Sequence, residues 1–159
     1  MAVFLFIFLV LMIIYAFLIE YYRRSWNEMP EFKAASPAHE PFISVVIPVR
    51  NEEKNLSFLI DSLKQQKYPS ARFEVIIVDD HSTDESWKIL ESASKEAITI
   101  RSIKLADYLS SSQQIKAHKK FAIEKGIDLA RGELIVTTDA DCVFGNNWLI
   151  YIASLYVTS

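Results

Sequence analysis

The sequence predicts an α/β protein in which a parallel sheet is flanked by helices and preceded by one transmembrane helix. From residue 42 onward, short runs rich in Val and Ile alternate with segments whose apolar residues recur every three or four positions. This alternation is typical of βαβ units, which build a parallel sheet covered on both faces. Before residue 42, the chain opens with a block of uncharged, apolar residues.

The opening block is long enough to cross a bilayer. Residues 2–19 carry no charge, and fourteen of these eighteen residues are Val, Leu, Ile or Phe. As a helix the stretch would measure about 27 Å, close to the roughly 30 Å hydrocarbon core. A cleaved signal peptide is the alternative, but nothing basic precedes the run and bulky Tyr21, Tyr22 and Trp26 follow it. We expect residues 1–22 to form an uncleaved membrane anchor.

Basic residues after the anchor predict its orientation. Arg23 and Arg24 follow the apolar block directly, and positive charge favours the cytoplasmic side. The chain is therefore expected to be a single-pass protein of the cell membrane with its domain in the cytoplasm. Residues 23–41 hold three of the five prolines and read as a linker, so the domain is expected to occupy residues 42–159.

Four strands and four helices are expected in this domain. The strands are the short apolar runs at residues 43–47, 74–78, 98–103 and 133–138. The helices are the segments of helical periodicity at residues 52–66, 82–96, 117–130 and 146–155. Pro48 is expected to end the first strand, Asn51 to cap the first helix, and Ser82 or Thr83 to cap the second. Gly132 follows the third helix as a stop signal.

Polar residues follow three of the predicted strands. They lie within residues 48–52, 79–81 and 139–141, and ligands of parallel α/β sheets bind beyond the carboxyl ends of the strands. Asp139 and Asp141 converge on one point only if their strand has ended, because successive strand side chains point to opposite faces. Their mutual repulsion would be relieved by Mg²⁺ or Mn²⁺, which usually completes its shell with phosphate oxygens. The alternative is a solvated turn or a helix cap.

Other polar residues near this edge allow two interpretations each. Asp80 could accept a hydrogen bond from a base or ribose, or residues 79–84 could simply cap the next helix. Lys119 and Lys120 could face a phosphate, although a solvated helix face is the simpler interpretation. A ligand role for His81 is weakly supported.

The remaining residues and the composition exclude several classes of protein. His39 and His118 are interpreted as surface residues, and Cys142 as a buried small residue. The net charge of −3 gives no basic surface for nucleic acid, and one cysteine permits no disulfide framework. No Gly-rich phosphate loop is present, so P-loop and dinucleotide-binding classes are excluded.

Four stretches, in this order, resemble the family 2 glycosyltransferases, which have the Rossmann-like GT-A fold. They are ISVVIPVRNEEKNL (43–56), FEVIIVDDHSTDES (73–86), KKFAIEKGIDLARGELI (119–135) and VTTDADCVFGNNWL (136–149). The resemblance implies transfer of a sugar from a nucleotide diphosphate donor, usually with inversion, to a glycan or lipid acceptor. It also implies a divalent metal, Mg²⁺ or Mn²⁺, that stabilises the departing diphosphate.

The resemblance assigns roles to residues of this chain. Pro48, Asn51 and Glu52 would lie against the nucleoside. Asp80, with Asp79 beside it, resembles the acid that contacts the base. In the later stretches, Lys119 matches the basic residue of the family, Asp139 a ligand of ribose or metal, and Asp141 the direct metal ligand.

The sequence also departs from the family pattern. Val49 and Arg50 differ from the common residues before Asn51, and Glu124 sits where Asn is common. His81 and His118 both stand where Gly is frequent. These departures leave the donor sugar and the base open.

The family has a further half that carries the carboxylate general base, and no residue here is placed for that role, so the catalytic residue is unknown. We expect an incomplete domain that is inactive alone, or a non-catalytic, membrane-bound nucleotide-sugar-binding fragment. A receiver domain and a nucleotidyltransferase are rivals, but the DAD spacing and the lack of glycines in PVRNEE disfavour them.

Overall fold

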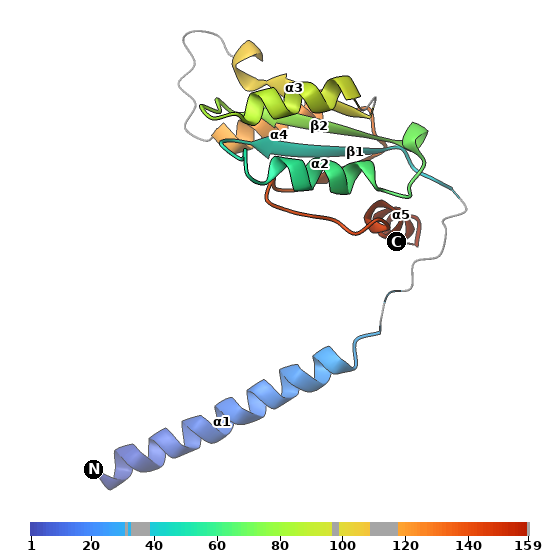
Figure 1. The fold of residues 1–159 in the computed structure, drawn as a ribbon. Helices are drawn as coiled ribbons and strands as arrows, with labels where there is room; N and C mark the ends of the chain where they lie inside the picture. The colour runs from blue at the N-terminus through green and yellow to red at the C-terminus, as the bar shows by residue number, and fades with distance from the viewer. Residues whose placement is uncertain (31, 33–38, 97–98, 109–117, 159) are drawn as a thin grey trace. The chain divides into compact units, whose positions relative to one another are not determined.

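The computed structural model describes residues 1–30, 32, 39–96, 99–108 and 118–158. The chain forms two compact units, Met1–Lys33 and Ala34–Ser159, and each is considered by itself. The first unit contains one helix, and the second contains a sheet with its covering helices (Figure 1).

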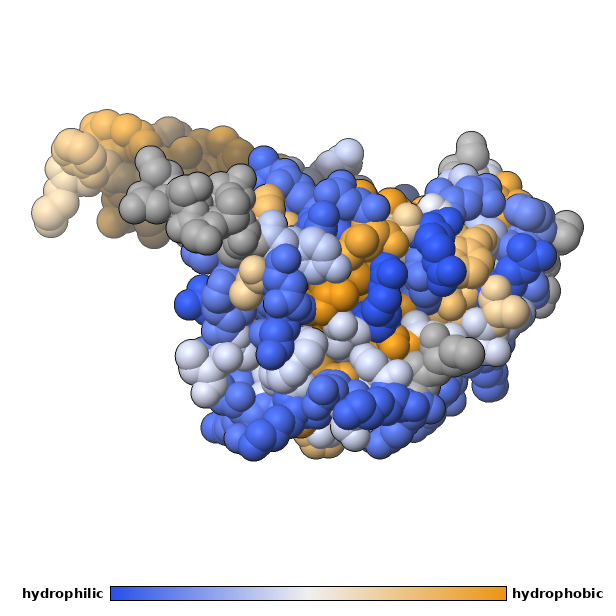
Figure 2. Space-filling model, turned by 90° about the horizontal axis from the view of Figure 1, so that it is seen from above, coloured by the Kyte–Doolittle hydropathy of each residue, from blue (hydrophilic) through white to orange (hydrophobic). Residues whose placement is uncertain are grey.

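Helix α1 (Ala2–Asn27) is long and apolar enough to cross a membrane, with a mean hydropathy of 3.2 over its most apolar window and none of that window buried. It continues five residues past the predicted end of the anchor. The Glu20 carboxylate accepts hydrogen bonds from Arg23 at 2.7 Å and Arg24 at 2.9 Å, and such pairs one turn apart support a helix. In Figure 2 an elongated hydrophobic segment contrasts with the mainly hydrophilic visible face of the globular part. Membrane anchoring itself stays a prediction.

The second unit is built on a parallel sheet with strand order β3-β2-β1-β4. The strands are β1 (Ile43–Val49), β2 (Phe73–Asp79), β3 (Ile100–Lys104) and β4 (Leu134–Thr137). All four predicted strands are present, although residue 98 of the third lies outside the described residues. The parallel α/β prediction is confirmed.

One strand boundary was predicted wrongly, because β1 runs through Pro48 to Val49. Proline disrupts a central strand by removing a hydrogen-bond donor on one side. Here the pairing of β1 with β4 ends at Val46 opposite Thr137, so Pro48 has only β2 as a neighbour. The strand therefore tolerates the proline and carries it to the edge of the sheet where the polar residues lie.

Helices cover both faces of the sheet, as predicted (Figure 1). They are α2 (Leu56–Lys64), α3 (Ser86–Glu96), α4 (His118–Asp128) and α5 (Trp148–Thr158), with short 3-10 turns η1 (Ser70–Arg72) and η2 (Leu105–Tyr108). The buried residues of α2, α3 and α5 join one core cluster, and those of α4 and η2 join the cluster on the other face. Residue 117, the predicted start of α4, lies outside the described residues.

The larger core shows why these segments are helical. Leu56, Leu59 and Leu63 recur at helical spacing on α2 and are essentially fully buried. They pack in one cluster with Leu90 of α3. Burying a leucine side chain contributes about 1.5–3 kcal/mol, so this stripe fixes α2 on the sheet.

Helix α4 approaches the sheet closely at Gly126. A methyl group at Gly126 would overlap the Cγ1 atom of Val46 in β1. We predict that Gly126→Ala destabilises the second unit by about 1–3 kcal/mol, the usual range for overpacking, despite the better helix propensity of alanine. Gly145→Ala is the control, since open space surrounds Gly145. Thermal melts of both variants, followed by circular dichroism, check this, and equal melting temperatures would contradict the close packing.

A buried carboxylate joins β1, β2 and the turn before β4. Glu74 accepts hydrogen bonds from Ser44 Oγ at 2.8 Å and from the Arg131 backbone N–H at 2.8 Å. It also accepts one from the Arg131 guanidinium at 2.9 Å. Ser44 Oγ in turn accepts one from the Gly132 backbone at 2.8 Å. These contacts lie near the amino ends of the strands, away from the polar edge. They therefore serve stability.

Candidate functional site

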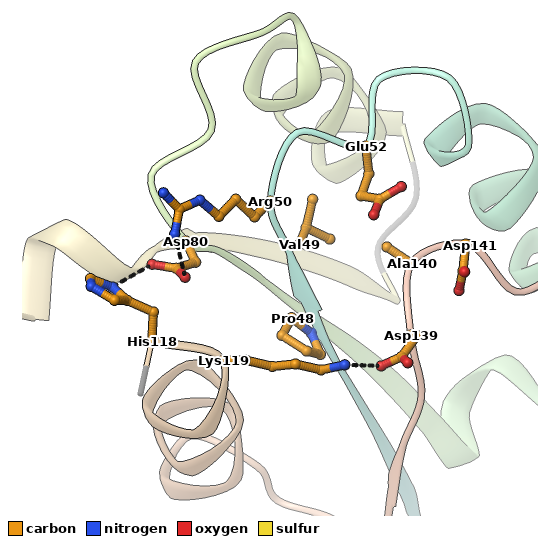
Figure 3. Close-up of a pocket in the computed structure, with 10 residues that line it drawn as sticks. All are labelled: Pro48, Val49, Arg50, Glu52, Asp80, His118, Lys119, Asp139, Ala140 and Asp141. Atoms are coloured by element: carbon orange, nitrogen blue, oxygen red, sulfur yellow. Dashed lines mark hydrogen bonds and ion pairs between the residues drawn. The ribbon is translucent and has the colours of Figure 1, made fainter. Parts of the chain in front are cut away.

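The polar residues predicted at the carboxyl edge of the sheet do surround one cavity. It measures about 410 Å³ and opens among the loops after β1, β2 and β4 and the first turn of α4 (Figure 3). Its lining residues are Pro48, Val49, Arg50, Glu52, Asp80, His118, Lys119, Asp139, Ala140 and Asp141. The rule that ligands bind beyond the carboxyl ends of parallel strands thus predicted the position of the cavity.

The loop after β1 is held by the loop after β2. Asn51 has a φ of 56°, in the left-handed region that asparagine tolerates better than most residues. Its backbone N–H donates to Ser82 Oγ at 3.0 Å, and its side-chain oxygen accepts from the Thr83 backbone at 2.8 Å. The Glu52 N–H donates to Ser86 Oγ at 2.9 Å. Together these bonds fix the direction in which Glu52 enters the cavity.

These contacts correct the predicted caps of two helices. Asn51 does not cap α2, which begins at Leu56 after Asn55. Its side chain is instead committed to Thr83. Ser82 and Thr83 do not cap α3 either, because Asp84 Oδ1 accepts the hydrogen bond from the Ser86 N–H at 3.0 Å. A cap pattern cannot be distinguished in sequence from a bond between two loops that lie far apart in the chain.

The two acids after β2 lie in different environments. Asp80 lines the cavity, and its side chain is only 5% exposed. The Arg50 guanidinium lies 3.8 Å from Asp80 Oδ2. Asp79 ends β2, is also buried, and does not line the cavity; its Oδ1 has no hydrogen-bond partner among the described residues. Consecutive residues of an extended chain point apart, which explains why only one of the pair reaches the cavity.

The two acids after β4 both reach the cavity because the strand ends at Thr137, before them. Asp139 and Asp141 are exposed, and buried Ala140 lies between them. Lys119 Nζ, from the first turn of α4, lies 2.8 Å from Asp139 Oδ1 (Figure 3). Its hydrogen bond to Asp139, together with the charges of both aspartates, raises the pKa of Lys119. Both predicted acids therefore line one cavity, and the Lys119 ammonium lies beside Asp139.

The structure places most, but not all, of the predicted site residues around the cavity. Asn51 and Asp79 do not line it. Sequence reasoning gave no role to the lining residues Val49, Arg50, His118 and Ala140, although each adjoins a residue that it did single out.

Two further interpretations of single residues change. His118 is half-exposed and donates from Nδ1 to Asp80 at 3.1 Å, so it is not simply a surface residue. Its position directly before Lys119 was the available signal. Cys142 is half-buried rather than buried, with Sγ 3.8 Å from Asp141 Oδ1.

Comparison with known proteins decides the family. The model of "Glycosyl transferase family 2" matches residues 44–156, most of the chain and nearly all of the second unit. The chain belongs to glycosyl transferase family 2. It is 31% identical over 116 residues to the beta-monoglucosyldiacylglycerol synthase of Nostoc sp.. It is 35% identical over 108 residues to the poly(ribitol-phosphate) beta-glucosyltransferase of Bacillus spizizenii.

The match covers only part of these relatives. It takes in 73% of this chain but 24% of the Nostoc enzyme, and 68% of this chain but 16% of the Bacillus enzyme. The chain therefore spans about a quarter or less of the length of these curated relatives.

Solved structures support the GT-A fold of this family 2 chain. The mannosyltransferase PcManGT of Pyrobaculum calidifontis, in complex with GDP-Man and Mn²⁺, aligns with a TM-score of 0.67 and 26% identity. That alignment covers 87% of this chain and 39% of the mannosyltransferase. Staphylococcus aureus TarS with UDP-GlcNAc aligns with a TM-score of 0.55 and 29% identity, over 67% of this chain and 28% of TarS. Family and fold together displace the receiver-domain and nucleotidyltransferase interpretations.

Proposed function

We propose that this chain supplies the donor site of a metal-dependent glycosyltransferase that takes a sugar from a nucleotide diphosphate. The observation that carries the proposal is the meeting of Asp80, Lys119, Asp139 and Asp141 around one cavity at the carboxyl edge of the sheet. Two neighbour structures hold GDP-Man with Mn²⁺ and UDP-GlcNAc. Named relatives make a glucosyl lipid and a glucosylated poly(ribitol-phosphate). A glycan or lipid acceptor and an inverting transfer complete the proposal.

The nucleoside end of the donor is assigned to the β1 and β2 side of the cavity. Asp80 presents a buried carboxylate, an acceptor suited to the N–H groups of a base. Pro48 and Glu52 form the β1 wall of the same cavity. Asn51 and Asp79, which do not line the cavity, are proposed to act by holding this wall in position.

The donor set on the β4 side fits a divalent metal. Asp139 and Asp141 offer hard carboxylate oxygens. The Lys119 ammonium 2.8 Å from Asp139 supports a role of this side of the cavity in holding positive charge. Asp141 is the proposed direct ligand and Asp139 a ligand of metal or ribose. The metal, Mg²⁺ or Mn²⁺, would supply Lewis-acid stabilisation of charge on the diphosphate. Lys119 adds a second positive charge on the same side.

The first unit is proposed to anchor this site to the cell membrane. An uncharged stretch of eighteen residues and a mean hydropathy of 3.2 support a single span, and Arg23 and Arg24 after it support a cytoplasmic domain. An anchored domain would work beside lipid-linked acceptors.

Calorimetric titration of the detergent-solubilised chain with UDP and GDP, with and without Mn²⁺, tests this function. We expect Mn²⁺-dependent binding of one nucleotide, and its loss by at least about 10-fold in Asp141→Asn, since a charged contact contributes about 1.5–3 kcal/mol. Asp61→Asn, on the exposed side of α2, is the matched control and should bind normally. Equal nucleotide affinity with and without Mn²⁺ in the folded chain would refute the metal-dependent donor site.

A further inference from the structure

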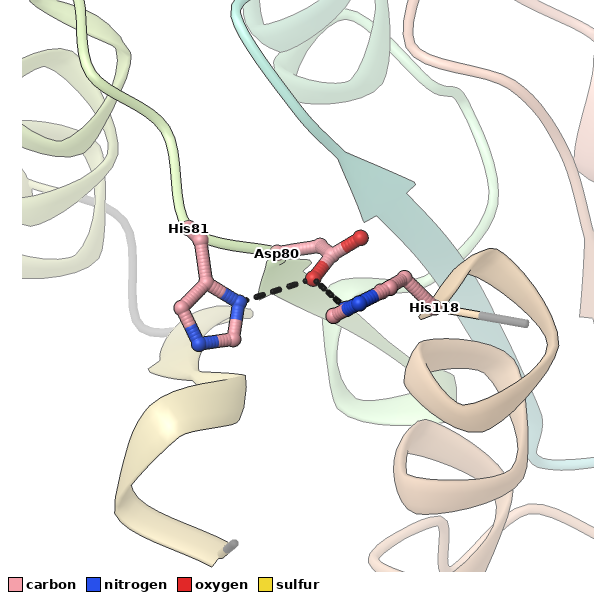
Figure 4. Close-up of side chains that lie close together, drawn as sticks. All are labelled: Asp80, His81 and His118. Carbon is pink, nitrogen blue, oxygen red and sulfur yellow. Dashed lines mark hydrogen bonds and ion pairs between the residues drawn. The ribbon is translucent and has the colours of Figure 1, made fainter. Parts of the chain in front are cut away.

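Two histidines from separate parts of the chain share one carboxylate oxygen (Figure 4). His81 Nδ1 lies 2.9 Å from Asp80 Oδ1, and His118 Nδ1 lies 3.1 Å from the same atom. The two rings meet edge to face, with centroids 5.7 Å apart. A carboxylate can only accept, so both Nδ1 atoms donate to it.

The three side chains are held in position by the surrounding structure. Asp80 is buried, and its backbone N–H donates to the Val49 carbonyl at 2.8 Å. His81 has a φ of 58°, a left-handed conformation that side chains rarely adopt. Arg50 lies beside the other oxygen of Asp80, which leaves Oδ1 facing the histidines. The cluster is thus built from a buried acid and two half-exposed rings that open toward solvent.

We propose that Asp80, His81 and His118 form a Zn²⁺ site, separate from the proposed Mg²⁺ or Mn²⁺ site at Asp139 and Asp141. Two imidazole nitrogens and one carboxylate oxygen form a ligand set found in zinc sites that leave a fourth position to water.

The distances agree with this assignment. Ligand atoms in a tetrahedral zinc site lie about 3.3 Å apart, given bonds of about 2.0–2.1 Å. The observed 2.9 Å and 3.1 Å between Asp80 and the two histidines need an outward shift of only a few tenths of an ångström. All three ligand atoms lie within 4.8 Å of one another, so the two histidine nitrogens would move toward each other on binding. On binding, each neutral ring keeps its proton by moving it from Nδ1 to Nε2.

Ligand chemistry separates the two metal sites although both adjoin one cavity. Asp139 and Asp141 offer only oxygen, which suits Mg²⁺ and Mn²⁺, whereas imidazole nitrogen favours zinc and other transition metals. Zinc on Asp80 would occupy the acceptor that the proposed function assigns to the base. We therefore expect Zn²⁺ to weaken nucleotide binding; this consequence rests on the proposed function, whereas the zinc site does not.

Competition between the detergent-solubilised chain and a chromophoric chelator for Zn²⁺ tests the site. His118→Ala and His81→Gly should each weaken zinc binding by about 10- to 100-fold or more. Losses of that size are seen even for residues that only hydrogen-bond to a metal ligand. Glycine is chosen at residue 81 because it accepts the left-handed backbone. His39→Ala is the matched control, since His39 is exposed beside Glu133. The double variant Asp139→Asn/Asp141→Asn should keep its zinc affinity.

Three results would overturn the zinc site. They are zinc affinity unchanged in His118→Ala, zinc affinity lost in the Asp139→Asn/Asp141→Asn variant, and a folded wild-type chain that takes up neither Zn²⁺ nor Co²⁺. Co²⁺ bound to the wild-type chain should give a visible tetrahedral absorption band that Zn²⁺ abolishes, which keeps the test independent of variant folding. If zinc binds as expected but leaves UDP and GDP affinity unaltered, the zinc site is supported and the base-binding role of Asp80 is refuted.

Discussion

Replacing Lys119 with methionine is expected to change metal and nucleotide binding in opposite directions. The Lys119 ammonium lies 2.8 Å from Asp139 Oδ1 and is attracted by Asp141 as well. In the absence of a ligand, the Lys119 ammonium pairs with the Asp139 carboxylate, and a divalent cation would have to compete with it for that carboxylate. Removing it should strengthen Mn²⁺ binding by about 1.5- to 5-fold, because an exposed ion pair contributes about 0.2–1 kcal/mol. The same change removes a cation from the proposed diphosphate site.

Nucleotide binding in the presence of Mn²⁺ should therefore fall in Lys119→Met. A hydrogen bond to a charged group contributes about 1.5–3 kcal/mol, so we expect a loss of roughly 10- to 150-fold in UDP or GDP affinity. Mn²⁺ binding is followed by electron paramagnetic resonance and nucleotide binding by calorimetry. Lys120→Met is the control, because Lys120 pairs with Glu124 and does not line the cavity. A variant in which both affinities fall, or neither changes, would contradict the proposed exchange of partners.

Glu74→Gln is expected to produce the largest loss of stability among isosteric changes in the second unit. The amide keeps the shape of the side chain but turns one acceptor oxygen into a donor facing Arg131. Leaving buried polar groups without partners costs about 1–3 kcal/mol, and we expect a loss of about 2–3 kcal/mol in the free energy of unfolding. Denaturant titration followed by near-ultraviolet circular dichroism measures it. In the control Glu91→Gln, on the exposed face of α3, the free energy of unfolding should stay within about 0.5 kcal/mol of wild type.

The contribution of Glu74 to the free energy of unfolding should also depend on pH. Burial by itself would raise the pKa of Glu74, but hydrogen bonds from Arg131 and Ser44 outweigh it and lower the pKa below its ordinary value of 4.5. A lowered native pKa means that the stabilisation is complete above the unfolded value and is lost as the pH falls through the native one. The stability difference between wild type and Glu74→Gln should therefore be constant at neutral pH and shrink below about pH 4.5. A difference at pH 3 that is as large as at neutral pH would contradict this.

Much of the fold could be predicted because its signals are local. The β-branched runs of the four strands and the spacing of Leu56, Leu59 and Leu63 each report one element, and the structure confirms them. The predicted parallel direction of the strands places their carboxyl ends at one edge of the sheet, so the sequence already predicted that Asp80, Asp139 and their neighbours lie close together.

The missed details all depend on contacts between distant segments. Asn51 is a residue type that often caps helices, but its side-chain oxygen accepts a hydrogen bond from Thr83, 32 residues away. His118 has no partner within its own helix, and its partner Asp80 lies 38 residues earlier in the chain. Pro48 continues β1 only because β4 is short on that side. Such contacts follow from the assembled sheet, so local sequence patterns could not predict them.

The most direct test of the central claim is the effect of Mn²⁺ on the phosphorus signals of a nucleotide bound to the detergent-solubilised chain. If Asp139 and Asp141 hold a metal against the diphosphate, Mn²⁺ should strongly broaden the β-phosphate resonance of bound UDP or GDP. Mn²⁺ also binds free nucleotide, so the reference is the same nucleotide and Mn²⁺ without the chain. The broadening should fall to that reference level in Asp141→Asn and exceed it in wild type and in Asp61→Asn. Bound nucleotide whose β-phosphate resonance is broadened equally in wild type and Asp141→Asn would contradict the metal-bridged donor site.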